Sequence, residues 1–337
     1  MSTFILKFFF KIPVLVLSIF YKKKPSFRGH QFDIQSQALI SLQPTLDLST
    51  LPDNEIESIR NLIIKNRVQH NLSSSPKNFV NKVDHFLGKD KTLCREYIPS
   101  KISSNKAILF FHGGGYTMGS TADHMQLIAS LVILSSISIL GVDYRLCPQH
   151  RFPAPIDDAE AAYRWLMLQG YSQKAIGFSG ISAGGLIVTQ LIYRCQNQGI
   201  QIPSVALVMS GPKDLDFDRP SCIYNSKYDI IIPKRLRNIR NYYIPDHNDT
   251  KESELYPARQ QYEKYPKTLF QVGDCEVLLD DSIEFFRFLR QQGHPINLQI
   301  IPDMIHCGQI FSDVYPPGEK AILSAAEFLQ SSLSKDM

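Results

Sequence analysis

Short, nearly continuous apolar runs recur along the chain from about residue 80 onward. The clearest are AILFF, ISIL, VALVM and TLFQV, and the runs predict strands at 83–88, 93–99, 106–113, 136–144, 174–180, 204–211, 268–274 and 296–302. Such runs are typical of strands that are covered on both faces of a sheet. Helical patterns lie between them at 157–169, 183–197 and 280–292. This alternation predicts an α/β fold, with a mostly parallel sheet between two layers of helices.

Two segments interrupt this alternation. Residues 31–80 show helical and loop patterns without strands, and residues 212–265 separate two strands that a crossover of about a dozen residues could join. We interpret both as parts of one cap over the carboxyl edge of the sheet. The predicted organisation is an N-terminal basic-apolar segment (1–28), the first part of the cap (29–80), the first part of the α/β core (81–211), a cap insertion (212–265) and the second part of the core (266–337).

The N-terminus reads FILKFFFKIPVLVLSIFYKKK. Its unbroken apolar part, Ile12 to Phe20, is only nine residues long, and three lysines follow it instead of a small-residue cleavage site. This pattern disfavours a cleaved secretory signal and is shorter than the roughly 20 apolar residues of a full span. We interpret residues 1–28 as an anchor or an interfacial segment that contacts a membrane surface. The alternative is an amphipathic helix that packs against the rest of this protein, which would then be cytoplasmic.

Charge and cysteine usage exclude several classes of function. The net charge is +4, yet residues 1–28 contain six basic residues and no acid, so the rest of the chain is close to neutral. A face that binds nucleic acid is therefore not expected. The six cysteines form no C-x-x-C pair, and no phosphate-binding glycine loop occurs. The sequence thus predicts reduced thiols, no metal and no organic cofactor.

One serine lies where a strand turns directly into a helix. Gly180-Ile181-Ser182-Ala183-Gly184 fits the G-x-S-x-G pattern, in which a sharp turn exposes the serine hydroxyl above the sheet. Side chains two residues before and after the serine would collide with neighbouring backbone, so both positions need glycine. The alternative is a serine that only caps the helix.

A glycine-rich loop follows an earlier strand. His112-Gly113-Gly114-Gly115 comes directly after AILFF, and consecutive glycines leave backbone N–H groups accessible. The amides of Gly113 and Gly114, with that of Ala183, are candidate donors to an oxyanion. A flexible turn is the alternative for this loop alone. The two motifs together are more specific than either one.

A nucleophilic serine needs a histidine base and an acid that orients it. If the chain order is serine, acid, histidine, only His294 and His306 remain. His306 follows the last strand, at the edge where Ser182 lies, whereas His294 precedes that strand. We therefore choose His306. Asp274 and Glu276 both lie in the loop after the preceding strand, and the pattern does not decide between these two acids.

The chain from about 80 to 330 resembles the hormone-sensitive-lipase family of α/β-hydrolases. The matching stretches, in the order of the family, are FFHGGGY, VDYRLCPQHRFPAPIDDA, GISAGG, VGDCEVLLDDS and PDMIHCG. The resemblance implies an eight-stranded α/β-hydrolase sheet with a helical cap. Its D/E-x-L-x-D pattern matches residues 276–280, which implies Glu276 as the acid and Asp280 as a supporting residue.

The remaining positions of the motifs follow the family with some departures. The resemblance implies Ser182 as nucleophile, His306 as base, the amides of Gly113, Gly114 and Ala183 as oxyanion hole, and supporting roles for His112 and Gly115. Ile181 stands where the family usually has an acid. A supporting ion pair is expected between Arg145 and Asp157 or Asp158.

The expected activity is that of a serine carboxylesterase or lipase. The resemblance implies carboxylic esters with a short to medium acyl chain, and the substrate would be a small-molecule ester or a lipid. The chemistry would need no cofactor. Two alternatives remain: a non-catalytic small-molecule receptor on the same fold, and an amide deacetylase of the arylacetamide type.

Overall fold

The computed structural model describes residues 80–100, 105–231, 233–244, 252–313 and 315–333. The predicted N-terminal segment (1–28) and the first part of the cap (29–80, apart from Val80) therefore lie outside the described residues. No helix within the described ranges is both long and apolar enough to cross a membrane.

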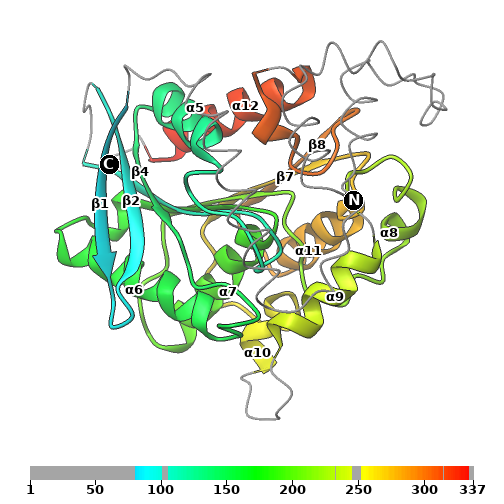
Figure 1. Cartoon of the computed structure of the whole chain (residues 1–337), viewed down its shortest axis with the longest axis horizontal. Coiled ribbons are helices and arrows are strands. Elements are labelled where there is room, and N and C mark those ends of the chain that lie inside the picture. Colours follow the sequence, from blue (N-terminus) through cyan, green and yellow to red (C-terminus); the bar gives the residue numbers. More distant parts are fainter. Residues whose placement is uncertain (1–79, 101–104, 232, 245–251, 314, 334–337) are drawn as a thin grey trace, which may run out of the picture.

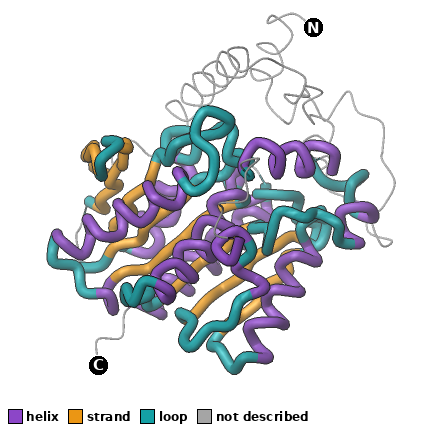
Figure 2. The backbone as a smooth tube through the Cα atoms, turned by 90° about the horizontal axis from the view of Figure 1, so that it is seen from below, coloured by secondary structure: helices purple, strands orange, loops and turns teal. Residues whose placement is uncertain are grey.

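An eight-stranded sheet runs through the middle of the molecule, in the order β1-β2-β4-β3-β5-β6-β7-β8. In Figure 2 its strands lie between the helices. The strands are β1 (Val80–Leu87), β2 (Thr92–Pro99), β3 (Ala107–Phe111), β4 (Ser138–Val142), β5 (Ile176–Ile181), β6 (Val205–Met209), β7 (Lys267–Gly273) and β8 (Ile296–Ile301). β1 and β2 pair antiparallel, β2 pairs antiparallel with β4, and the other pairs are parallel. Each predicted strand is present, with ends shifted by up to a few residues.

Helices cover both faces of this sheet (Figure 1). α5 (Met125–Ser135) and α12 (Pro316–Leu333) lie together on one face, and α6 (Ala154–Leu168), α7 (Ala183–Asn197) and α11 (Leu279–Gln291) lie on the other. The sequence predicted the helices on the second face and missed both helices of the first. α6 also begins three residues earlier than predicted, at Ala154, directly after Pro153.

The sheet separates two apolar cores. One core packs β3, β5 and β6 against α6, α7 and α11, and the other packs the opposite face of the same strands against α5 and α12. All five residues of β3 and of β6 are buried, as the continuous apolar runs AILFF and VALVM predict. Each fully buried leucine, isoleucine or phenylalanine contributes about 1.5–3 kcal/mol, so burial of the central strands contributes strongly to the stability of the fold.

Residues 212–265 leave the sheet between β6 and β7 and return over its carboxyl edge. Their described part forms α8 (Pro220–Tyr224), α9 (Pro233–Tyr243), α10 (Glu252–Leu255) and the short 3₁₀ helix η3 (Pro257–Arg259). A buried ion pair joins this segment to the core, because Arg194 of α7 donates to Glu254 of α10 at 2.6 and 2.9 Å. Both side chains are almost completely buried.

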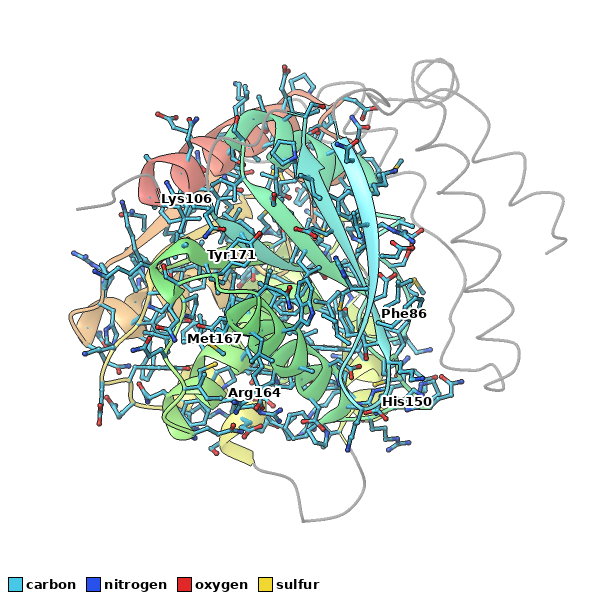
Figure 3. The ribbon with its side chains drawn as sticks, turned by 90° about the vertical axis from the view of Figure 1, so that its left-hand side faces the viewer. Phe86, Lys106, His150, Arg164, Met167 and Tyr171 are labelled. Carbon is cyan, nitrogen blue, oxygen red and sulfur yellow. The ribbon has the colours of Figure 1, made fainter. Side chains whose placement is uncertain are left out.

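An ion pair on the outer surface of α6 is much more exposed than the Arg194–Glu254 pair. Figure 3 shows Arg164 and Met167 on this helix and Tyr171 beyond its end. Arg164 pairs with Glu160 one turn earlier, at 2.7 Å, and its side chain is half exposed. Arg145 forms the expected supporting ion pair with Asp158, whereas Asp157 pairs with Arg194.

Replacing Arg194 by methionine should destabilise the protein strongly. Arg194→Met leaves the buried Glu254 carboxylate without its guanidinium partner, and such a loss costs about 3–5 kcal/mol. The matched control Arg164→Met removes an exposed pair and should cost less than about 1 kcal/mol. Urea unfolding followed by circular dichroism measures both changes. Equal losses in the two variants would contradict the structural role of the buried pair.

Candidate active site

Five loops meet at the carboxyl edge of the parallel strands. They follow β3, β5, β6, β7 and β8, and they begin with His112, Ser182, Ser210, Asp274 and Pro302. Because neighbouring parallel strands end at the same edge, side chains from positions far apart in the sequence come together there. Each motif predicted from the sequence lies at this edge.

Ser182 occupies a sharp turn between β5 and α7. Its backbone has φ 55° and ψ −122°, a region in which a residue with a side chain is strained by about 1–3 kcal/mol. The turn needs its two glycines: a Cβ on Gly180 would collide with the carbonyl of Gly184, and a Cβ on Gly184 would collide with the carbonyl of Phe111. The Ser182 hydroxyl makes no capping hydrogen bond to α7, which argues against the interpretation as a helix cap.

The hydroxyl of Ser182 instead contacts His306. Its Oγ lies 2.9 Å from Nε2 of His306, and Nδ1 of the same ring lies 3.0 Å from Oε2 of Glu276. The three side chains come from the loops after β5, β8 and β7 and form one continuous hydrogen-bonded row. A neutral imidazole that donates from Nδ1 to the carboxylate presents the lone pair of Nε2 to the serine hydroxyl.

The carboxylate of Glu276 is buried and has two further donors. Its Oε1 accepts a hydrogen bond from the Gly273 backbone N–H at 2.6 Å and from the Ser210 hydroxyl at 2.8 Å. Burial raises the pKa of Glu276, and these two donors oppose that rise because they stabilise the charged form. The acid is therefore held in one orientation, facing the imidazole.

His306 is also buried, with 4% of its surface exposed. Burial disfavours the imidazolium ion and lowers the pKa of His306 to about 4, and the nearby negative charge of Asp229 opposes this effect. In the resting protein the ring is consequently neutral near pH 7, which is the form that can accept a proton.

The glycine-rich loop after β3 lies against the serine. A Cβ on Gly113 would lie 3.2 Å from the Ile181 carbonyl oxygen and 3.3 Å from Cβ of Ser182. The N–H of Gly113, however, donates to Nε2 of His124 at 3.3 Å. Nδ1 of His124 lies 2.9 Å from the Ser120 carbonyl and donates to it, which leaves Nε2 as the acceptor.

The other two predicted oxyanion donors, Gly114 and Ala183, have different surroundings, and so does Gly115, which was predicted only in a supporting role. The N–H groups of Gly114, Gly115 and Ala183 have no acceptor among the residues that the structure describes. Gly114 and Gly115 have φ angles of 120° and 60°, in the left-handed region that favours glycine. The expectation that the Gly113 amide faces the site therefore needs correction, because His124 already accepts its hydrogen bond.

The side chain of His112 packs against the glycine-rich loop. Its ring is fully buried and stacks on Tyr144, with 4.2 Å between the ring centroids. Its Nδ1 lies 2.7 Å from the Gly113 carbonyl oxygen, and its own carbonyl accepts a hydrogen bond from the Tyr144 hydroxyl at 2.8 Å. Side-chain and backbone contacts together fix the conformation of the loop.

Helix α9 covers the same loop from the opposite side. Tyr243 stacks on Tyr116, which follows the third glycine, with ring centroids 3.8 Å apart. A Cβ on Gly115 would collide with the side chain of Ile239, so α9 approaches the loop closely. Residues of α9 thus pack directly against the glycine-rich loop.

The remaining candidates lie apart from this row. Asp274 accepts a hydrogen bond from the Asp303 backbone N–H at 2.8 Å and has no contact with His306. Asp280, predicted as a supporting residue, bonds Ser221: its Oδ2 accepts from the backbone N–H at 2.8 Å, and its own N–H donates to the hydroxyl at 3.1 Å. His294 lies in the loop between α11 and β8, away from the site.

Ile181 packs into the core beneath α5 and α12 and is fully buried. The position next to the serine therefore faces the opposite side of the sheet from the reactive hydroxyl.

Two buried residues at the site were missed by the sequence interpretation. Ser210 follows β6 and contacts Glu276, and Asp229 contacts the backbone of His306 at 2.8 Å. A polar residue directly after a buried strand could have indicated Ser210. Asp229 lies in the insertion, where no pattern in the sequence marks it.

The described residues contain no group of three or more histidine, cysteine or acidic residues able to hold a metal ion. All six cysteines are buried thiols, and Cys275 and Cys307 form no disulfide with each other.

Comparison with known proteins identifies the family. Residues 108–310 match the family described as alpha/beta hydrolase fold. The chain belongs to this family. An esterase from Acinetobacter venetianus is 30% identical over 237 residues, which cover 70% of this chain and 78% of that protein. An acetyl-hydrolase from Streptomyces hygroscopicus is 28% identical over 243 residues, covering 72% of this chain and 81% of that protein.

Solved structures of α/β-hydrolases agree with this assignment. The crystal structure of an esterase from the bacterial hormone-sensitive lipase family superposes with a TM-score of 0.78 at 26% identity, covering 89% of this chain and 97% of that one. The predicted fold, an eight-stranded α/β-hydrolase, and the resemblance to the hormone-sensitive-lipase family are thereby confirmed. The predicted enzyme class, a carboxylic ester hydrolase, is confirmed with them.

Proposed function

We propose that this α/β-hydrolase cleaves carboxylic esters through Ser182, His306 and Glu276. The observation that carries the proposal is the row of hydrogen bonds, 2.9 Å from Ser182 to His306 and 3.0 Å from His306 to Glu276. A serine, a neutral imidazole and a buried carboxylate in this order form the arrangement that activates a hydroxyl for attack on an acyl group.

In the first step, Nε2 of His306 accepts the hydroxyl proton while Oγ of Ser182 attacks the ester carbonyl carbon. Glu276 stabilises the imidazolium that forms, and its two further donors keep it in position. The imidazolium then gives its proton to the leaving alcohol, and an acyl-enzyme remains on Ser182. Water, activated by His306, releases the acid and restores the serine.

The negative charge on the former carbonyl oxygen needs nearby N–H donors. We assign this role to Gly114, Gly115 and Ala183, because their amides have no acceptor among the described residues, whereas the Gly113 amide is bonded to His124. The N-terminus of α7 adds a favourable helix dipole. Each such donor contributes roughly 10²–10³ in rate.

The proposed substrates carry short to medium acyl chains. Relatives include the acetyl-hydrolase and an ethyl acetate hydrolase from Pseudomonas putida, and a neighbouring esterase structure was soaked with p-nitrophenyl butyrate. The loop that carries Gly114 and Gly115 is itself packed against apolar side chains of α9, Tyr243 on Tyr116 and Ile239 on Gly115. Residues 1–28 remain our proposal for contact with a membrane surface.

Ser182→Ala should abolish ester hydrolysis without unfolding the protein. The test is a panel of p-nitrophenyl acetate, butyrate, octanoate and palmitate, with p-nitroacetanilide as the amide. We expect turnover by the wild type that is highest for acetate or butyrate, and a loss on the order of 10⁶-fold in kcat for the variant. A wild type that binds but does not cleave the esters would favour the receptor, and faster cleavage of the anilide would favour the amide deacetylase.

Glu276→Gln should lower kcat by about 10³–10⁴-fold, because the glutamine amide cannot stabilise the imidazolium and favours the wrong tautomer of His306. Asp274→Asn is the matched control, since the neighbouring acid has no contact with His306, and it should leave kcat close to the wild-type value. Steady-state kinetics on the best ester of the panel measure both variants. A reversed ranking would identify Asp274 as the acid.

The pH dependence should reflect the buried imidazole. Since burial lowers the pKa of His306, the base stays neutral in acid where an ordinary histidine, with a pKa of about 6.5, would already be charged. We expect kcat/KM to fall only as the pH drops well below 6.5, and to be constant above that point until other groups titrate. An acidic limb centred at or above about 6.5 would contradict the neutral resting state.

A further inference from the structure

The turn that follows α8 contains a fully buried acid with no role in the proton transfers above. Asp229 lies in this turn, within the segment that leaves the sheet between β6 and β7, and its side chain has no exposed surface. A buried carboxylate is costly unless several donors satisfy it. Its partners therefore indicate what it is for.

The carboxylate of Asp229 binds the backbone of both loops that carry the acid and the base. Its Oδ2 accepts from the N–H of Val277, next to Glu276, at 2.8 Å. Its Oδ1 accepts from the N–H of His306 itself at 2.8 Å, and from the adjacent Ile230 at 2.7 Å. One rigid group thus spans the loop after β7 and the loop after β8.

Asn225, at the start of the same turn, complements this contact. Its Nδ2 donates to the carbonyl oxygens of Asp274 at 3.0 Å and of Glu276 at 2.8 Å. The turn consequently binds the loop after β7 in two ways: Asn225 donates to two carbonyl groups of that loop, and Asp229 accepts from one of its N–H groups. Its own backbone is closed by the N–H of Asp229, which donates to the Asn225 carbonyl at 3.0 Å.

We propose that Asp229 is a positioning residue for ester hydrolysis, whose carboxylate fixes the backbone of the Glu276 loop relative to that of the His306 loop. The proposal rests on the function proposed for Ser182, His306 and Glu276. Asp229 bonds the backbone of His306 and not its ring, so it acts through the position of these side chains. It also makes the turn after α8, from Asn225 to Asp229, a part of the catalytic framework.

The charge of Asp229 gives this role a second, electrostatic signature. The acids that face His306 are Glu276, on the loop after β7, and Asp229, on the turn after α8. Burial raises the pKa of Asp229 to about 6, against the effect of His306 and of its backbone N–H donors, so it is charged at neutral pH. Its negative charge favours the imidazolium form of His306.

Asp229→Asn tests the proposal because asparagine has a single oxygen. Of the N–H groups of Val277 and His306, one must then face an amide NH₂ group, and the two loops must move apart. A misplacement of about 1 Å can cost on the order of 10²-fold in rate. We expect kcat to fall by about 10–100-fold with KM changed less than about threefold, because Asp229 does not touch the substrate. We also expect the acidic limb of kcat/KM to move to lower pH.

Asp214→Asn is the matched control. Asp214 is also a buried acid of the same segment, with 1% exposed surface, and it accepts hydrogen bonds from the Asp216 N–H and from Arg219 instead of the two loops. This control should lose stability without a change in kcat or in the acidic limb. Thermal unfolding and circular dichroism of each variant separate loss of fold from loss of rate.

The outcomes decide between the inference and the function on which it rests. A wild type inactive on every ester would overturn the proposed function. An active wild type, an inactive Ser182→Ala and a folded Asp229→Asn with wild-type kcat and acidic limb would overturn only the role of Asp229. If Asp229→Asn does not fold, Asp229→Glu decides: its longer side chain keeps the charge and displaces the carboxylate. We expect an unchanged acidic limb with kcat lowered at least about tenfold, and wild-type kcat would overturn the proposal.

Discussion

The shared edge of the parallel strands is the constraint on which the site depends. Because β5, β6, β7 and β8 are consecutive parallel strands that end at the same edge, a serine, a carboxylate and an imidazole separated by up to 124 positions in the chain form hydrogen bonds of 2.9 and 3.0 Å. The strands can hold this edge because β3 and β6 are buried along their whole length. The same sheet thus forms the apolar cores on its two faces and brings the polar side chains of the site together at its edge.

Burial of the row of side chains has opposite effects on its members. The pKa of His306 falls and that of Glu276 rises, because low polarity disfavours charge on either group. The donors on Glu276 and the negative charge of Asp229 oppose these effects. The site therefore rests with an uncharged base and is arranged to stabilise a transient positive charge on it, which is the requirement for proton transfer during acyl transfer.

The sequence predicted the elements whose signal is local. The strands, α7 and the elbow at Ser182 follow from apolar runs and from glycines whose missing side chains make room for the backbone. Asp274 and Glu276 could not be separated by pattern, because they lie two residues apart and only the direction of each side chain distinguishes them. The bond from Gly113 to His124, the Asp280–Ser221 contact and the role of Asp229 depend on tertiary packing, and no spacing in the chain encodes them.

The attachment of residues 212–265 has a consequence for the movement of this segment. This segment is fastened to the core at α8, through Ser221 and Asp280, at α9, through the stacked tyrosines, and at α10, through the buried Arg194–Glu254 pair. A flap free to swing on a hinge would have to break all of these contacts in each turnover. Movement of the described part of this segment away from the core is accordingly opposed at three separate places.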